Sequence, residues 1–196
     1  MKDTSEHWPV TATEENYRNG LIAVRSDTVR FPDGSSAERT VVHHPGAVAV
    51  VALDDVQRVL MIRQYRHPVG RKLWEIPAGL RDVAGENLLV AAQRELAEET
   101  GYRAREWYLV ADWFTSPGFC DEQIRCFLAC GLEEIPAGET TFVKSHEEAY
   151  LEQAWLPLEA AVKAVLDGDM HNGVAAMGIL AVYAAAADGF AGLRPA

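Results

Sequence analysis

Residues 79–102 read GLRDVAGENLLVAAQRELAEETGY, and this stretch decides how the rest of the sequence is interpreted. Its second half has a helical period, because leucine and alanine recur at steps of three and four residues from Leu89 to Leu96. Gly101 ends the pattern as a C-terminal cap does, so we predict a helix over residues 87–100. A glycine-containing loop precedes that helix.

The predicted helix carries three glutamates close together. Glu95 and Glu99 are one turn apart on the same face, and Glu98 lies beside them. Like charges at this spacing repel by roughly 0.2–0.5 kcal/mol per exposed pair, and the helix dipole disfavours anions near the C-terminal end. A hard divalent cation prefers such oxygen ligands, whereas the carboxylates alone would also fit a solvated acidic face. Arg94 and Arg81 lie close enough in sequence to organise or partly neutralise the cluster.

The rest of the chain shows strand patterns followed by helical ones, which indicates an α+β fold, an α/β/α sandwich. Before residue 45, short β-prone runs alternate with turn dipeptides. Helices are predicted over residues 158–166 and from a cap at Asn172 through residue 187. The strands predicted after residue 45 cover residues 47–53, 59–62, 73–76, 107–113, 123–130 and 152–156.

Composition and charge exclude several classes of function. The 196 residues include 18 basic and 29 acidic side chains, so the formal net charge is -11 and nucleic acids and anionic membranes would be repelled. The longest uncharged run, residues 173–187, is too short to span a membrane. Cys120, Cys126 and Cys130 are too few and too scattered for a disulfide framework, and the last two fit small core residues. We therefore expect a cytoplasmic protein with neither nucleic-acid nor membrane partners.

The quoted stretch resembles the Nudix box, whose pattern is Gly, five residues, Glu, seven residues, and then Arg-Glu-apolar-x-Glu-Glu-x-Gly-apolar. From Glu86 onward every position fits. The one departure is that six residues separate Gly79 from Glu86, and Gly85 occupies the expected glutamate position. Pro117 lies sixteen residues after Gly101, where the ADP-ribose pyrophosphatase branch of the family carries its marker proline.

The resemblance covers roughly residues 20–188 and implies a mixed β-sheet flanked by helices, with a small N-terminal antiparallel sheet. It divides the chain into an N-terminal β segment, residues 1–44, and a Nudix hydrolase domain, residues 45–196. In the resembled branch the N-terminal strands pair with a second subunit, and a small sheet of this kind is marginal in isolation. The resemblance therefore implies a homodimer.

The implied reaction is hydrolysis of the diphosphate of ADP-ribose to AMP and ribose 5-phosphate, with water as the nucleophile. The cation that the resemblance implies is Mg²⁺, with Mn²⁺ as the alternative. A general base comes from the late acidic loop, at Glu147 or Glu148, and one sequence does not separate the two. The metal ligands that it implies are the backbone carbonyl of Ala78 and the carboxylates of Glu95, Glu98 and Glu99.

Substrate contacts are expected from the basic group ahead of the helix and from the segment around the marker proline. Arg66, at a strand end, could bind a phosphate through a bidentate contact of its guanidinium group. Arg63 lies in the same basic group. Pro117 and Phe119 are the candidates from the second segment, with Phe119 as one aromatic wall for adenine.

Two other functions remain open at this point. A Nudix hydrolase could act on another nucleoside diphosphate sugar or a dinucleotide, and Pro117 is the feature against this alternative. A non-catalytic module could bind ADP-ribose as a regulator. Retention of Glu95, Glu98 and Glu99 favours the enzyme.

Overall fold

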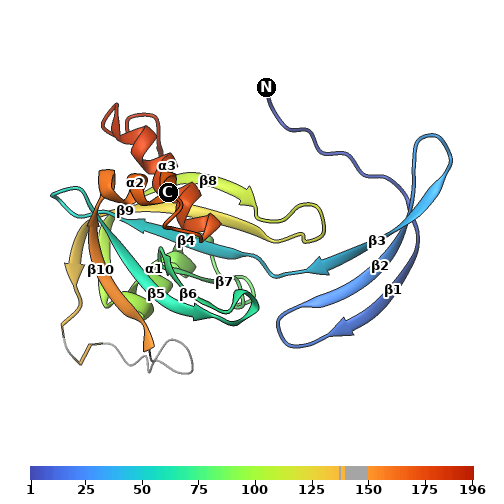
Figure 1. Ribbon diagram of the computed structural model, residues 1–196, viewed down its shortest axis with the longest axis horizontal. Helices are drawn as coiled ribbons and strands as arrows, with labels where there is room; N and C mark the ends of the chain where they lie inside the picture. The colour runs from blue at the N-terminus through green and yellow to red at the C-terminus, as the bar shows by residue number, and fades with distance from the viewer. Residues whose placement is uncertain (137, 140–149) are drawn as a thin grey trace. The chain divides into compact units, whose positions relative to one another are not determined.

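The computed structural model describes residues 1–136, 138–139 and 150–196, and the chain forms two compact units (Figure 1). Unit 1 contains residues 1–46 and 114–123, and unit 2 contains residues 47–113 and 124–196. Within unit 1, the backbone of residues 114–123 forms hydrogen bonds with Val42 of the N-terminal sheet.

Unit 1 is built on an antiparallel three-stranded sheet in the order β1 (Val10–Arg18), β2 (Ala23–Arg30) and β3 (Ser36–His43). Every residue of β1 is exposed, and only Ala23 and Asp27 of the three strands are buried. Such a sheet has almost no core of its own.

Unit 2 contains a five-stranded mixed sheet in the order β11-β8-β9-β4-β7 and a three-stranded antiparallel sheet in the order β10-β5-β6. The β4–β9 pair is parallel, and the other described pairs are antiparallel. A short 3₁₀ turn, η1 (His67–Val69), joins β5 to β6. The bounds are β4 (Ala47–Ala52), β5 (Arg58–Arg66), β6 (Arg71–Glu75), β7 (Ala78–Leu80), β8 (Tyr102–Phe114), β9 (Gln123–Glu134), β10 (Glu152–Pro157) and β11 (Arg194–Pro195).

Helices cover both faces of the sheets of unit 2, as Figure 1 shows, with α1 (Leu88–Thr100) on one face and α2 (Leu158–Leu166) and α3 (Gly173–Ala186) on the other. The buried strand β4 alternates between two apolar clusters. Ala49 and Val51 pack in the cluster that includes α2 and α3, whereas Val48 and Val50 pack in the cluster of α1. The predicted α/β/α sandwich is therefore confirmed.

The helix ends are set by the residues that the sequence indicated. The side chain of Asn87 accepts a hydrogen bond from the N–H of Leu89, and Gly101 ends α1 with a left-handed φ of 77°. Asn172 caps α3 by accepting from the N–H of Ala175. In the described part of the chain, no helix combines the length and the apolar character that crossing a bilayer requires.

The cysteines of β9 differ in burial. Cys126 is fully buried, as expected for a small core residue, and burial raises the pKa of its thiol to about 12. Cys130 is half-buried and packs against the same core, and burial raises the pKa of its thiol to about 11. Both thiols therefore stay protonated near neutral pH.

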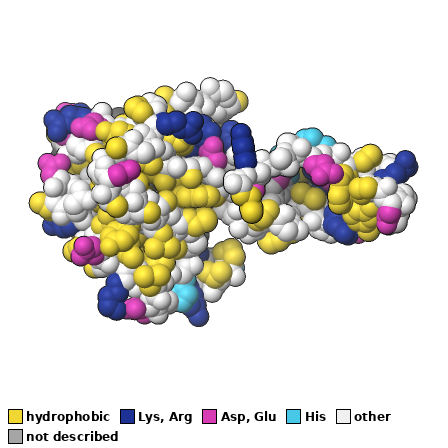
Figure 2. Space-filling model, turned by 90° about the horizontal axis from the view of Figure 1, so that it is seen from above, with side chains coloured by type: hydrophobic (Ala, Val, Ile, Leu, Met, Phe, Trp, Pro, Cys, Tyr) yellow, Lys and Arg dark blue, Asp and Glu magenta, His cyan; other side chains and the backbone are white. Residues whose placement is uncertain are grey.

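The surface carries both signs of charge. Among the described residues on the face drawn in Figure 2, acidic and basic side chains are interspersed.

Candidate active site

The C-terminal half of α1 lies against the short strand β7, and two glutamates make the contact. The side chain of Glu99 is buried, and its Oε2 accepts a hydrogen bond from the N–H of Ala78 at 3.0 Å. A Cβ atom on Gly79 would lie only 1.9 Å from Cδ of Glu95 and 2.2 Å from both of its carboxylate oxygens. Glycine at position 79 is therefore what allows the Glu95 carboxylate to lie directly on the backbone of β7.

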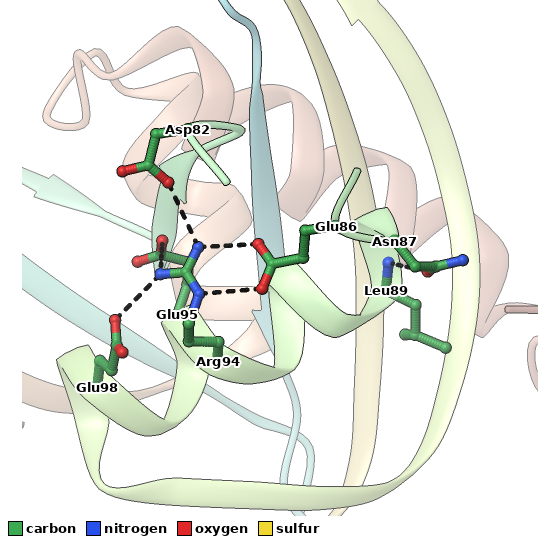
Figure 3. Close-up of polar contacts among 7 residues, drawn as sticks. All are labelled: Asp82, Glu86, Asn87, Leu89, Arg94, Glu95 and Glu98. Atoms are coloured by element: carbon green, nitrogen blue, oxygen red, sulfur yellow. Dashed lines mark hydrogen bonds and ion pairs between the residues drawn. The ribbon is translucent and has the colours of Figure 1, made fainter. Parts of the chain in front are cut away.

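Arg94 gathers four carboxylates around one guanidinium group (Figure 3). Its Nη1 donates to Oε1 of Glu95 at 2.7 Å and to Oε2 of Glu98 at 3.2 Å. Its Nη2 and Nε donate to the two oxygens of Glu86 at 3.1 and 3.3 Å, which is a forked pair. Asp82 lies further away, with 3.7 Å between its Oδ1 and Nη2. We call these five residues the Arg94 cluster.

The extra residue in the loop before α1 does not remove Glu86 from the cluster. Gly85, which stands at the expected glutamate position, has a φ of 79°, a conformation that favours glycine. The chain then places Glu86 in its forked contact with Arg94. No role was predicted for Glu86 or Asp82. Both are acidic residues in the same box as the basic Arg94, and this opposite charge was the signal that could have identified them.

The Arg94 cluster is unevenly charged. If all four carboxylates are ionised, their charge exceeds that of Arg94 by three. Burial raises the pKa of Glu95, and the neighbouring Arg94 opposes that rise. The hydrogen bond with Glu86 raises the pKa of Arg94, so the guanidinium stays charged. The positive charge of Arg94 therefore holds the four carboxylates together without neutralising them.

The chemistry of this donor set fits a hard divalent cation, because the groups are carboxylate oxygens with excess negative charge. The side chains do not form a ready-made cage. Among the described residues, no three Asp, Glu, His or Cys side chains converge on a point that could hold an ion. Glu95 and Glu98 turn toward Arg94, while Glu99 turns toward Ala78.

Arg66 and Arg63 lie on β5, and acidic partners hold both. Nε and Nη2 of Arg66 donate to the two oxygens of Glu75 at 2.9 and 2.6 Å, and Glu75 is only 2% exposed. Arg63 contacts Glu152 at 3.4 Å, and its guanidinium lies 5.6 Å from the ring centroid of Trp74. Glu75 was not among the predicted site residues. A charged residue between two apolar ones in a strand was the signal that could have identified it.

The other predicted site residues lie elsewhere or outside the described residues. Pro117 and Phe119 lie in the segment of unit 1 between β8 and β9, and Phe119 is exposed. Glu147 and Glu148, the candidates for the general base, fall outside the described residues. The structure thus brings together the residues of the box, and the role of each predicted residue stays a prediction.

Comparison with known proteins gives a consistent result. The model of the NUDIX domain matches residues 43–176. The ADP-ribose pyrophosphatase of Mycobacterium tuberculosis is 46% identical over 97% of this chain and 90% of its own length. The ADP-ribose pyrophosphatase of Bacillus subtilis is 36% identical over 86% of this chain and 88% of its own length. The crystal structure of an ADP compounds hydrolase superposes with a TM-score of 0.76 at 21% identity, covering 96% of this chain and 99% of the other.

Proposed function

Because the chain belongs to the Nudix family and is a Nudix hydrolase, we propose that it hydrolyses the diphosphate of ADP-ribose to AMP and ribose 5-phosphate with a divalent cation. The observation that carries the proposal is the Arg94 cluster, together with the approach of Glu95 to Gly79. A helix optimised for stability alone would not gather carboxylates near its C-terminal end. The names of the two relatives support the choice of substrate.

Glu95, Glu98 and Glu99 would hold the cation, with the carbonyl of Ala78 as a further oxygen. Mg²⁺ is the ion we propose, with Mn²⁺ as the alternative. When bound, such an ion neutralises phosphoryl oxygens and makes a nearby water more acidic. It also lets a chain of net charge -11 bind an anionic substrate.

The protein's own groups hold the site in place. Arg94 orients Glu95 and Glu98, and Glu99 ties α1 to β7 through the N–H of Ala78. Buried Glu75 fixes the guanidinium plane of Arg66, which we propose contacts a phosphate at the end of β5. Glu147 or Glu148 would accept the proton of the attacking water.

We also propose that the protein is a homodimer through unit 1. The full exposure of β1 and the scarcity of buried residues in its sheet support a partner for this sheet. Sedimentation of the full chain and of a variant lacking residues 1–44 tests this, and two monomeric species would reject it.

Purified protein incubated with ADP-ribose and a panel of nucleoside diphosphate sugars, with Mg²⁺, with Mn²⁺ and with a chelator, tests the function. We expect release of AMP from ADP-ribose that requires a divalent ion and that exceeds the turnover of the other substrates. Turnover that persists in the chelator, or none with any substrate, would reject the proposal. A clear preference for another nucleotide sugar would leave the hydrolase and replace its substrate.

A further inference from the structure

The carboxylate of Asp121, in the segment between β8 and β9, contacts the end of β3. This segment and β3 both lie in unit 1. Oδ2 of Asp121 lies 2.7 Å from Nδ1 of His43, and Oδ1 accepts the N–H of His44 at 2.9 Å. Since an ionised carboxylate only accepts, the His43 ring donates in the first contact. Asp121 therefore holds two consecutive residues at the end of β3.

The backbone reinforces this attachment. The N–H of Val42 donates to the carbonyl of Phe119 at 2.7 Å, and the N–H of Asp121 donates to the carbonyl of Val42 at 3.2 Å. The carbonyl of Ser116 accepts from the N–H groups of Phe119 and Cys120, at 3.1 and 2.9 Å. The turn that contains Pro117 is thus closed on itself and is fixed to β3 immediately after Phe119.

The charged groups around this attachment come from three segments. Glu122 lies beside Asp121, with 3.3 Å between its Oε1 and Nδ1 of His44, and its other oxygen accepts from the hydroxyl of Thr115. The N–H of Gly46 also donates to Nδ1 of His44, at 3.1 Å. Arg25 on β2 adds its positive charge to the field at Asp121.

Asp121 is ionised at neutral pH in this setting. Burial acts to raise the pKa of its carboxyl, and the hydrogen bonds from His43 and from the N–H of His44 outweigh burial, so the pKa lies below its usual value. Because hydrogen bonds to an ionised group are stronger than neutral ones, Asp121 is the strongest side-chain attachment of this segment to β3 that the described residues show.

We propose that Asp121 is a positioning residue for substrate binding, holding the turn of Pro117 and Phe119 on β3 through His43 and His44. The proposal rests on the proposed function and on the sequence-based expectation that Pro117 and Phe119 contact ADP-ribose. Asp121 itself does not touch the substrate in this role. Its loss should weaken binding and leave the chemical step in place.

Steady-state kinetics with ADP-ribose on Asp121→Ala, Asp121→Asn and His43→Ala provide the test. We expect Asp121→Ala to raise KM at least about tenfold with an unchanged kcat, because it removes two charge-assisted hydrogen bonds and the loss of one already has an effect of about that size. Asp121→Asn should raise KM less, because its amide oxygen can still accept from the N–H of His44. The double variant Asp121→Ala/His43→Ala should match Asp121→Ala alone, because the contact that His43→Ala removes is already lost in Asp121→Ala.

Asp112→Asn is the matched control, because Asp112 forms an ion pair of the same length, 2.7 Å, with Arg125 on β9. It should leave KM unchanged, and circular dichroism should show all variants folded. A KM unchanged in Asp121→Ala, a fall in kcat alone, or a rise in KM equal to that of Asp112→Asn would overturn the positioning role. Failure of the wild-type protein to hydrolyse ADP-ribose would instead reject the proposed function and, with it, this role.

Discussion

Helices α1 and α3 cover opposite faces of the same sheet and use different kinds of residue to do so. α3 (Gly173–Ala186) contains no charged residue, and its buried side chains or backbone positions are Ala175, Gly178, Ile179 and Val182. α1 buries Glu99 and carries Glu95 and Glu98 next to Arg94. α3 therefore shows that uncharged residues suffice to cover the sheet. The charged residues of α1 are not needed for covering it.

Close packing alone explains α3. A Cβ on Gly178 would lie 3.0 Å from Cδ1 of Ile76 and 3.1 Å from Cγ2 of Val51, so the helix backbone lies almost directly on the sheet. At Gly79 the obstacle is a carboxylate instead of a methyl group. The difference indicates that α1 holds charged side chains close together, at some cost in stability, whereas the residues of α3 serve close packing against the sheet.

Replacing Glu95 by Gln should have the largest effect. The amide keeps the size of the side chain and an acceptor for Arg94 but removes the negative charge, so we expect kcat for ADP-ribose to fall about 10²- to 10³-fold, as when one preorganised electrostatic group is lost. Glu133→Gln, a glutamate that pairs with Arg103 at 3.2 Å, is the control and should be fully active. A fully active Glu95→Gln enzyme would show that the reaction does not need the negative charge of Glu95.

Gly79→Ala tests the same carboxylate without changing it. The added methyl group would displace the Glu95 side chain, and we expect activity to fall about 100-fold, because a displacement of about 1 Å has effects of that size at active sites. The melting temperature should change little, since the end of the Glu95 side chain can move. Gly173→Ala at the start of α3, where nothing lies within 4 Å of the new methyl group, should leave activity intact. Equal activity of the two variants would contradict the assignment of Glu95.

Gly178→Val tests the other helix. The larger side chain would press on Ile76 and Val51, and we expect the free energy of unfolding to fall by about 1–3 kcal/mol. Urea denaturation measures this loss, and kcat of the folded fraction should stay at the wild-type value. A loss of kcat without a loss of stability would show that the α3 face also takes part in the reaction.

The smallest effect is expected for a charge pair outside the Arg94 cluster. The hydrogen bonds from Arg125 lower the pKa of Asp112 although burial opposes this, so the folded state favours the ionised form. The contribution is then present above the unfolded pKa, about 4, and is lost as the pH falls through the lower folded value. Wild type should exceed Asp112→Asn in free energy of unfolding by no more than about 1 kcal/mol at pH 7, and the difference should shrink in acid.

A pH titration of unfolding for wild type and Asp112→Asn measures this difference. If the difference grows as the pH falls, the carboxyl is stabilised in its protonated form, and the expected direction of the effect is wrong.

Local patterns explain why much of this structure could be predicted. The helix of the box was expected over residues 87–100 and is observed as Leu88–Thr100, because an N-cap residue, an apolar period and a terminal glycine mark its two ends and its buried face in the sequence. β4 was predicted from its run of apolar residues, and α2 is observed over the predicted residues. Mixed charges within residues 79–102 also pointed to the site, and the family resemblance was confirmed.

Contacts between residues far apart in the chain were not predictable from such patterns. Glu75 reaches Arg66 only because β5 and β6 pair, and Asp121 reaches His43 across 78 positions. Which partner a carboxylate takes is decided by register and by the packing of elements, and a sequence pattern carries information on neither. The sequence by itself determined helices α1, α2 and α3, most of the strands and the family, whereas the short strands β7 and β11 were not predicted. Only the tertiary structure decided that the loop residues Asp82 and Glu86 would join Glu95 and Glu98 at Arg94, because folding, not helical spacing, brings the loop to the guanidinium.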